Sequence, residues 1–479
     1  MMQSIKKLFG PQDMTIGQPM RNLLMFSIPL LIGNFAQQMY STVDLKIVSD
    51  FVGENAMGAV GVTQPIINLL IVVLMAIGTG AGIMVSQYFG AKDRKKLSDT
   101  IGTSITLIVV TSLVMSVIAI PLVPTLLRLI NTTPEQFDMA RDYLIIILIG
   151  LMSSGLFNIL SGILRGLGDS VWPLVYLLLA VVLNLVLDVW FVMGLGMGVA
   201  GAAWATIISQ TVSAVLCLIR LFQMKSHVDL GRHNLRINKS LTLQLTRLGL
   251  PAGATQAIMS MSMLLVQSLT NSMGAAAVNT GIAVMRVDGF AMMPNFTFGM
   301  ALATFVGQNV GANRMDRVKQ GSRDGLIMTL SVSVVLSLLL ILFGHYLVGW
   351  FVETQLIIDL GTRAFRILAA GYIAVGISQV FQGIMRGAGD TMPSLWISLA
   401  SNIIRIPLAY LLAYLWRTPE WPNGTPDALY VSLLICWMMG AVFTYLWYRR
   451  GTWKEKSLIR RPGDPTIEMP EIEQAIELE

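Results

Sequence analysis

The feature that most constrains this chain is a series of apolar runs that recurs from one end of the sequence to the other. Each run is about 20 residues or longer, which is enough for a helix to cross a hydrocarbon core of roughly 30 Å. Only 13% of the residues are charged, whereas soluble proteins have about 25%. The pattern predicts an all-α polytopic membrane protein with twelve transmembrane helices, near residues 22–49, 56–88, 98–123, 140–163, 171–193, 198–222, 245–271, 277–307, 325–349, 364–385, 392–416 and 428–448.

The chain also carries an internal duplication. The loop sequence "QYFGAKDRKKL" begins at Gln87 and "QNVGANRMDRV" begins at Gln308, 221 residues later. The turns "GILRGLGDS" and "GIMRGAGDT" begin at Gly162 and Gly383, which are also 221 residues apart. A constant offset at separate places indicates a repeat. Because each repeat holds an even number of spans, the sequence predicts two six-helix lobes related by a parallel internal repeat, with a pseudo-two-fold axis along the membrane normal.

These boundaries divide the chain into five parts. We expect a cytoplasmic N-terminal tail over 1–21, an N-lobe with spans 1–6 over 22–222, a cytoplasmic linker over 223–244, a C-lobe with spans 7–12 over 245–450 and a cytoplasmic tail over 451–479. Two such lobes around a central cleft are an architecture for alternating access, which favours a transporter over a channel or a scaffold.

The basic residues predict how the chain is oriented. Twenty-five Lys and Arg residues fall on the side of the predicted membrane that holds both termini, and four fall on the other side. This asymmetry predicts that both termini are cytoplasmic. Residues 1–21 lack the apolar core and cleavage site of a signal peptide, so the first span is expected to remain as a membrane helix. The positive charge therefore orients the chain, and no soluble surface for nucleic acid is expected.

Four polar residues are expected to meet in the outer half of the N-lobe. Asn184 and Asp188 lie one helical turn apart in "LNLVLDVWFV", so they share one face of span 5. Asp44 in span 1 and Thr206 in span 6 lie at similar predicted depth. Two carboxylates, an amide and a hydroxyl could bind a hard cation such as Na⁺, for which Asp44, Asn184 and Asp188 would be ligands. Alternatively, two close carboxylates could share a proton.

A structural alternative remains open, because such groups can also hydrogen-bond between helices and simply hold them together. Two carboxylates at matched depth favour a cation-coupling site, because ionisable groups inside a membrane are costly. Lys46 follows Asp44 by two residues and so lies on another face, where it could pair with Asp50 or extend to the outer interface.

Other polar residues are candidates for the lining of the cleft. They are Gln37, Gln256, Arg286 and Asp288. For Arg286 and Asp288, in "VMRVDGF", two interpretations stay open: they could bond to neighbouring helices and fix the second lobe, or they could face the cleft.

The motifs resemble those of the multidrug and toxic compound extrusion (MATE) transporters. The resemblance rests on "IPLLIGNFAQQMYSTVD" in span 1, "QYFGA" and "GQNVGA" after spans 2 and 8, the two "RG-x-GD" turns, "LNLVLD" in span 5, "GAAWATIISQ" in span 6 and "RIPLAYLL" in span 11. It covers the whole chain apart from its tails. It implies a bacterial inner-membrane antiporter that exports amphiphilic, often cationic, drug-like compounds in exchange for Na⁺ or H⁺.

The resemblance also bears on the site and on partners. Asp44, Asn184, Asp188 and Thr206 match the family's N-lobe cation-site residues. Lys46 departs from the family's pattern and leaves the ion choice open. The expected partners are small-molecule substrates, the coupling cation and membrane lipid, with no nucleic acid and no cofactor, in a protein that works as a monomer.

Two competing functions were weighed. A flippase for a lipid-linked saccharide, from the same superfamily, would need several basic residues to hold a pyrophosphate, and the N-lobe spans offer only Lys46. An enzyme is not expected, because the longest internal polar loop, about 223–244, is too short for a catalytic domain of about 50 residues or more.

Overall fold

The computed structural model describes residues 10–231 and 233–459, and within these ranges it leaves the side chains of residues 40–50 and 54 undescribed. All regular secondary structure in the described part is helical. The helices are α2 (Pro19–Val52), α3 (Glu54–Gly90), α4 (Arg94–Leu129), α5 (Pro134–Ile149), α6 (Leu151–Gly166), α7 (Val171–Asp188), the π-helix η1 (Val189–Gly194), α8 (Gly198–Gln223), α9 (Lys239–Ser272), α10 (Ala275–Gly311), α11 (Met315–Gly349), α12 (Gln355–Ala388), α13 (Met392–Leu415), α14 (Asp427–Arg450) and the short 3₁₀ helix η2 (Thr452–Glu455).

The prediction of an all-α protein with twelve membrane helices is confirmed. In the described part of the chain, ten helices are long and apolar enough to cross a membrane, and α5 with α6 forms a further span bent by 48°. Helix α2, with 34 residues, completes the set. Several helices extend beyond the predicted runs, because polar residues continue them past the apolar segment.

The bend between α5 and α6 was not expected from the sequence, which predicted one straight span over 140–163. It lies at Gly150, where a β-carbon would come within 2.2 Å of Ile207 on α8. The absence of a side chain there lets α8 pack directly against the backbone, and a glycine in a helix interior weakens it by about 1 kcal/mol relative to alanine. Close packing and weak propensity together account for the bend.

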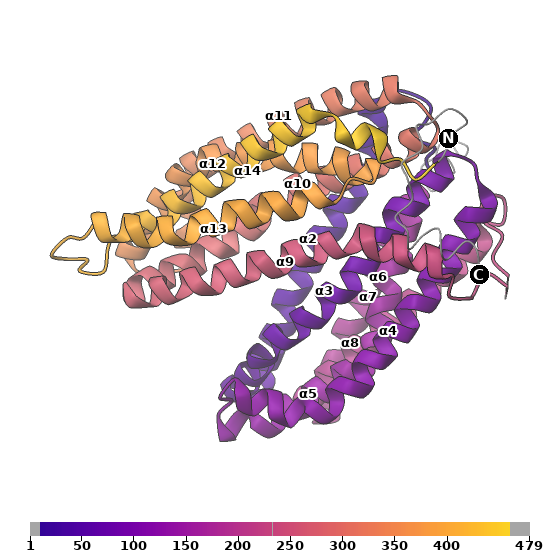
Figure 1. Ribbon diagram of the computed structural model, residues 1–479. Helices are drawn as coiled ribbons and strands as arrows, with labels where there is room; N and C mark the ends of the chain where they lie inside the picture. Colours follow the sequence, from indigo (N-terminus) through magenta and orange to yellow (C-terminus); the bar gives the residue numbers. More distant parts are fainter. Residues whose placement is uncertain (1–9, 232, 460–479) are drawn as a thin grey trace, which may run out of the picture.

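The helices form two bundles that meet at one end of the molecule (Figure 1). The first bundle contains α2 to α8 and the second contains α9 to α14. Both ends of the chain lie where the bundles meet, and we call this the terminal end. Towards the opposite end the bundles diverge, so the molecule has the shape of a V.

The first helix of each half contacts the other half near the terminal end. Leu23, Phe26 and Leu30 of α2 share a buried core with residues of α10 and α12. Leu245 of α9 lies in a core made mainly by α3, α4 and α6. The two halves are therefore interlocked at the terminal end, although the repeat divides them cleanly in sequence.

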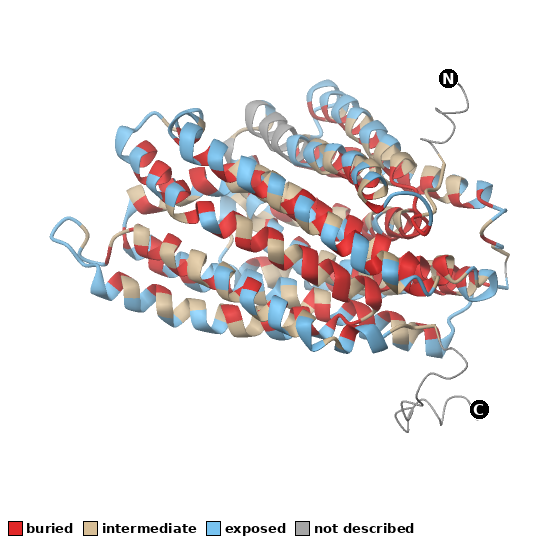
Figure 2. Ribbon diagram, turned by 90° about the horizontal axis from the view of Figure 1, so that it is seen from above, coloured by how far each residue is buried: buried red, intermediate tan, exposed pale blue. Residues whose placement is uncertain are grey.

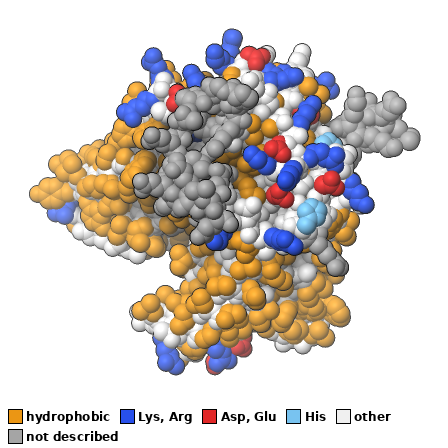
Figure 3. Space-filling model, turned by 45° about the vertical axis from the view of Figure 1, so that its right-hand side comes forward, with side chains coloured by type: hydrophobic (Ala, Val, Ile, Leu, Met, Phe, Trp, Pro, Cys, Tyr) orange, Lys and Arg blue, Asp and Glu red, His pale blue; other side chains and the backbone are white. Residues whose placement is uncertain are grey.

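The surface agrees with a membrane location. Figure 2 shows buried residues along the inner faces of the helices and exposed residues along their outer faces. In Figure 3, Lys and Arg gather at the terminal end, while hydrophobic side chains cover the flanks of both bundles and a notch separates them. Apolar flanks with a charged end are the pattern expected of a protein that is surrounded by lipid.

Candidate functional site

Three of the four predicted site residues meet inside the first bundle. Asn184 and Asp188, one turn apart on α7, are each only 1% exposed. The Asn184 side chain faces Thr206 of α8, with Nδ2 3.4 Å from the threonine Oγ1. With its amide turned so that the nitrogen faces the carboxylate, Asn184 donates to Asp188 Oδ2 at 2.7 Å and accepts from the Thr206 backbone N–H at 3.0 Å. Asn184 thus links the carboxylate to α8.

A change of helix type begins directly after Asp188. Residues 189–194 form the π-helix η1, and Gly196 and Gly198 then reverse the chain with φ of +65° and +59°. Such π-helical turns within helices are rare and are frequent at functional sites. Sequence reasoning missed this feature. The signal that could have revealed it is the glycine-rich run after Asp188, which permits the positive φ angles.

The structure does not place the fourth residue. Asp44 and its neighbour Lys46 lie within α2, but their side chains are outside the described residues. Helix α2 packs along α7, the helix that carries Asn184 and Asp188. The participation of Asp44 in the site therefore stays a prediction.

A polar cavity lies deeper in the same bundle. It has a volume of about 60 Å³. It adjoins the Asn184 cluster, because Ser209 in its wall donates to the backbone oxygen of Thr206 at 2.9 Å. Ser154 also donates to Gln210, another residue of the wall. None of the described residues that line the cavity is charged: Gln37, Phe157, Asn158, Leu177, Ala180, Val181, Ser209, Gln210 and Ser213.

The four residues proposed for the cleft lining lie in different surroundings. Gln37 lines the polar cavity of the first bundle. Gln256 is exposed on α9. Arg286 lies with its guanidinium 5.8 Å from the Phe351 ring centre. The Asp288 carboxylate instead accepts a hydrogen bond from the Tyr372 hydroxyl on α12.

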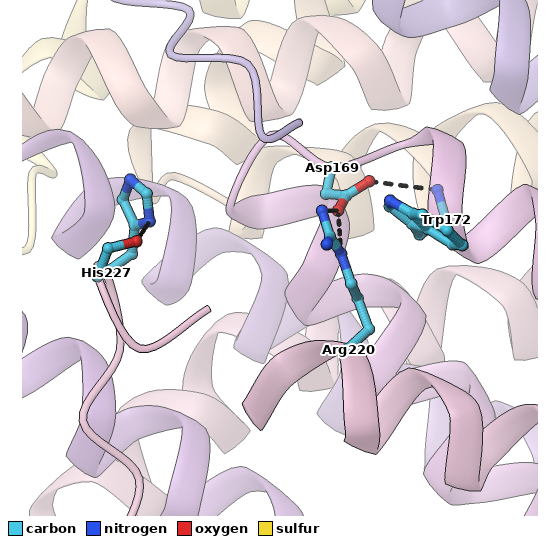
Figure 4. Close-up of polar contacts among 5 residues, drawn as sticks. Asp169, Trp172, Arg220 and His227 are labelled. Carbon is cyan, nitrogen blue, oxygen red and sulfur yellow. Dashed lines mark hydrogen bonds and ion pairs between the residues drawn. The ribbon is translucent and has the colours of Figure 1, made fainter. Parts of the chain in front are cut away.

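At the terminal end, an ion pair ties two helices of the first bundle together (Figure 4). Arg220 of α8 contacts the Asp169 carboxylate at 2.9 Å, and Asp169 is 1% exposed. The other Asp169 oxygen accepts from the backbone N–H of Trp172 at 3.2 Å, which caps the start of α7. Burial raises the pKa of the Asp169 carboxyl above its usual value, and the Arg220 guanidinium opposes that rise. His227, on the linker, lies with Nδ1 2.8 Å from Ser226 Oγ.

Comparison with known proteins gives a consistent result. The family model described as MatE matches residues 29–190 and 251–411. The probable multidrug resistance protein YpnP of Bacillus subtilis is 30% identical over 93% of this chain and 98% of its own length. The probable multidrug resistance protein YoeA of the same organism is 28% identical over 92% and 95%. A solved outward-facing conformation of a multidrug resistance MATE transporter superposes with a TM-score of 0.85 at 23% identity, covering 93% of this chain and 99% of the other.

Proposed function

The chain belongs to the MatE family, and on this premise we propose that it is a secondary active efflux transporter. It exports amphiphilic, often cationic, compounds by alternating access and takes up Na⁺ or H⁺ in exchange. The family model covers both halves of the chain, and two similar bacterial proteins are described as probable multidrug resistance proteins. The protein acts as a monomer in the bacterial plasma membrane and needs no cofactor.

The observation that carries the proposal is the buried cluster of Asn184, Asp188 and Thr206. A carboxylate that is 1% exposed inside a membrane helix is costly unless it binds a cation or a proton. The cluster offers a carboxylate, an amide and a hydroxyl, which are the oxygen donors that a hard cation prefers. Asp44 on the adjacent α2 would add the second carboxylate. A proton shared between the two carboxylates is the alternative form of the same site.

The path of the substrate follows from the shape of the molecule. If the basic terminal end faces the cytoplasm, as the charge asymmetry predicts, the V opens outwards and the described conformation is outward-facing (Figure 1). A compound would then leave from between the bundles towards the outside. The uncharged polar cavity beside Thr206 is a suitable surface for the polar part of such a compound.

The flippase alternative is not favoured. A pyrophosphate-bearing lipid would need basic side chains in the cavity, and the described residues that line it include none. Polar but uncharged walls suit a cationic or neutral amphiphile, because they do not repel a positive charge.

The test is export of the cationic dye ethidium from proteoliposomes with an imposed Na⁺ gradient or an imposed H⁺ gradient, each alone. We expect one gradient to drive export and an ionophore for that ion to abolish it. Export that needs neither gradient would contradict the proposal.

A further inference from the structure

A second isolated carboxylate lies inside the other bundle. Asp288 is part of α10, roughly 20 Å along the helix from its first residue at 1.5 Å per residue. It is half-buried. Its only described hydrogen-bond partner is the Tyr372 hydroxyl, which donates to it from α12. A tyrosine donor is neutral, so it satisfies one oxygen of the carboxylate without balancing its charge.

The surroundings of Asp288 are apolar. Val284, Val287 and Ala291, its neighbours on α10, belong to a buried core together with Phe365, Tyr372 and Tyr430. A carboxylate in such a place favours its neutral form, because burial penalises the charge and no cation offsets it.

The charged groups of the neighbouring elements are engaged elsewhere in the described part of the molecule. Arg286, on the same helix, lies over the Phe351 ring. On α14, Asp427 is paired with Arg363 of α12. His345 of α11 is exposed and lies against Tyr346. From α14, Tyr430 adds only a second phenol to the surroundings of Asp288.

We propose that Asp288, oriented by Tyr372, is a proton-binding site in the second bundle, separate from the Asn184–Asp188 cluster. Water in the open cleft supplies the proton, which binds the carboxylate oxygen to give a neutral carboxylic acid. Loss of the same proton on the other side of the membrane restores the carboxylate. The site deepens the antiport proposed above and rests on it.

The position of Asp288 on α10 explains how its proton could influence conformation. The next residue, Gly289, leaves a place where a β-carbon would lie 3.7 Å from Gln38 of α2. Phe290 packs on Phe35 of α2 with ring centres 5.6 Å apart. These contacts join the two bundles, so a change of charge at Asp288 acts directly beside the surface along which the bundles move. An ion shifts such an equilibrium only by binding its two states with different affinity.

The direct test is infrared difference spectroscopy of the purified protein during a pH titration. We expect a protonated-carboxyl band that disappears as the pH rises and that is absent from Asp288→Asn. Tyr372→Phe should keep the band but move its frequency, because the carboxyl group loses its donor. Asp359→Asn, an exposed carboxyl on α12 bonded to Gln355, is the matched control and should leave the band unchanged.

A second readout separates this site from the first. Ethidium affinity of Asp188→Asn should still change with pH by up to about tenfold per unit, as expected when one proton is linked to binding, and adding Asp288→Asn should remove that dependence. A band that persists in Asp288→Asn, or an unchanged pH dependence in the double variant, would overturn the proposal. Wild-type vesicles that export without any ion gradient would contradict the antiport while leaving the infrared result intact.

Discussion

Gln87 and Gln308 form the same cross-bundle hydrogen bond twice. Gln87 of α3 donates from Nε2 to the backbone oxygen of Gly387 at 2.9 Å, and Gln308 of α10 donates to that of Gly166 at 3.0 Å. Both glutamines are fully buried. The donors are 221 residues apart, and so are the acceptors. The pseudo-two-fold symmetry of the sequence therefore appears as two matched bonds that hold the terminal end closed.

The terminal segments complete this closure. The Gln308 side-chain oxygen accepts from the backbone N–H of Met14, and the Gln87 oxygen accepts from that of Leu458, each at 2.9 Å. Arg317 also contacts the backbone oxygens of Met14 and Gly17, at 3.1 and 2.8 Å. Each glutamine thus joins a turn of the opposite bundle to one end of the chain.

Replacing either glutamine should favour the conformation that is open at the terminal end. Gln87→Ala or Gln308→Ala leaves buried backbone groups without partners, at about 1–3 kcal/mol. The measurement is labelling by a thiol reagent of a cysteine introduced at Gly166 or Gly387, which should become faster in the variant. Gln355→Ala, at an exposed glutamine of α12, is the control. Unchanged labelling would show that these bonds do not hold the end closed.

The glycines beside these glutamines should tolerate no side chain. A β-carbon on Gly90 would lie 1.9 Å from the Gln308 backbone oxygen, and one on Gly311 would lie 2.0 Å from that of Gln87. Gly90→Ala should therefore separate α3 from α10 and lower the melting temperature of the purified protein. Gly61→Ala, in open space on the same helix, should be neutral or stabilising by up to about 1 kcal/mol. Equal melting temperatures for the two variants would refute the close contact.

The ion dependence of drug binding should require Asp44. Coupling is reciprocal, so a bound drug weakens cation affinity by the same factor as the cation weakens drug affinity. Asp44→Asn should retain drug binding but lose its dependence on the coupling ion. Drug affinity measured across a pH series and a Na⁺ series provides the check. A variant with wild-type dependence on either ion would exclude Asp44 from the site.

Loss of Arg220 should make stability depend on pH. Arg220→Gln leaves Asp169 buried without its cation, which costs about 3–5 kcal/mol. Burial already raises the pKa of Asp169, and removing the guanidinium raises it further. The folded variant then binds a proton more tightly than the unfolded chain, so stability recovers as pH falls through the folded pKa.

Thermal unfolding at pH 5 and pH 8 measures this effect. The variant should be destabilised less at the lower pH. Arg363→Gln, which breaks an exposed pair whose arginine side chain is 59% exposed, should show a small loss, because exposed ion pairs contribute little. An equal loss at both pH values for Arg220→Gln would contradict the assignment.

Much of the fold was predictable from the sequence, because lipid imposes long apolar helices and the repeat imposes symmetry. The neighbourhood of Asn184, Asp188 and Thr206 followed from helical spacing and depth. The bend at Gly150 did not, because it depends on the packing of Ile207 from a distant helix. The partner of Asp288 was equally hidden: Tyr372 lies 84 residues away, and nothing local indicates which helix faces it.

The central claim is that the Asn184–Asp188 cluster binds the ion that drives export. Its most direct test is to follow ethidium export and ion entry together in proteoliposomes that contain wild type or Asp188→Asn, with Asp359→Asn as the control. The account predicts that wild type and control move ion and dye in opposite directions. It predicts that Asp188→Asn, folded and inserted, moves neither under an ion gradient. Wild-type ion entry and dye export by Asp188→Asn would contradict it.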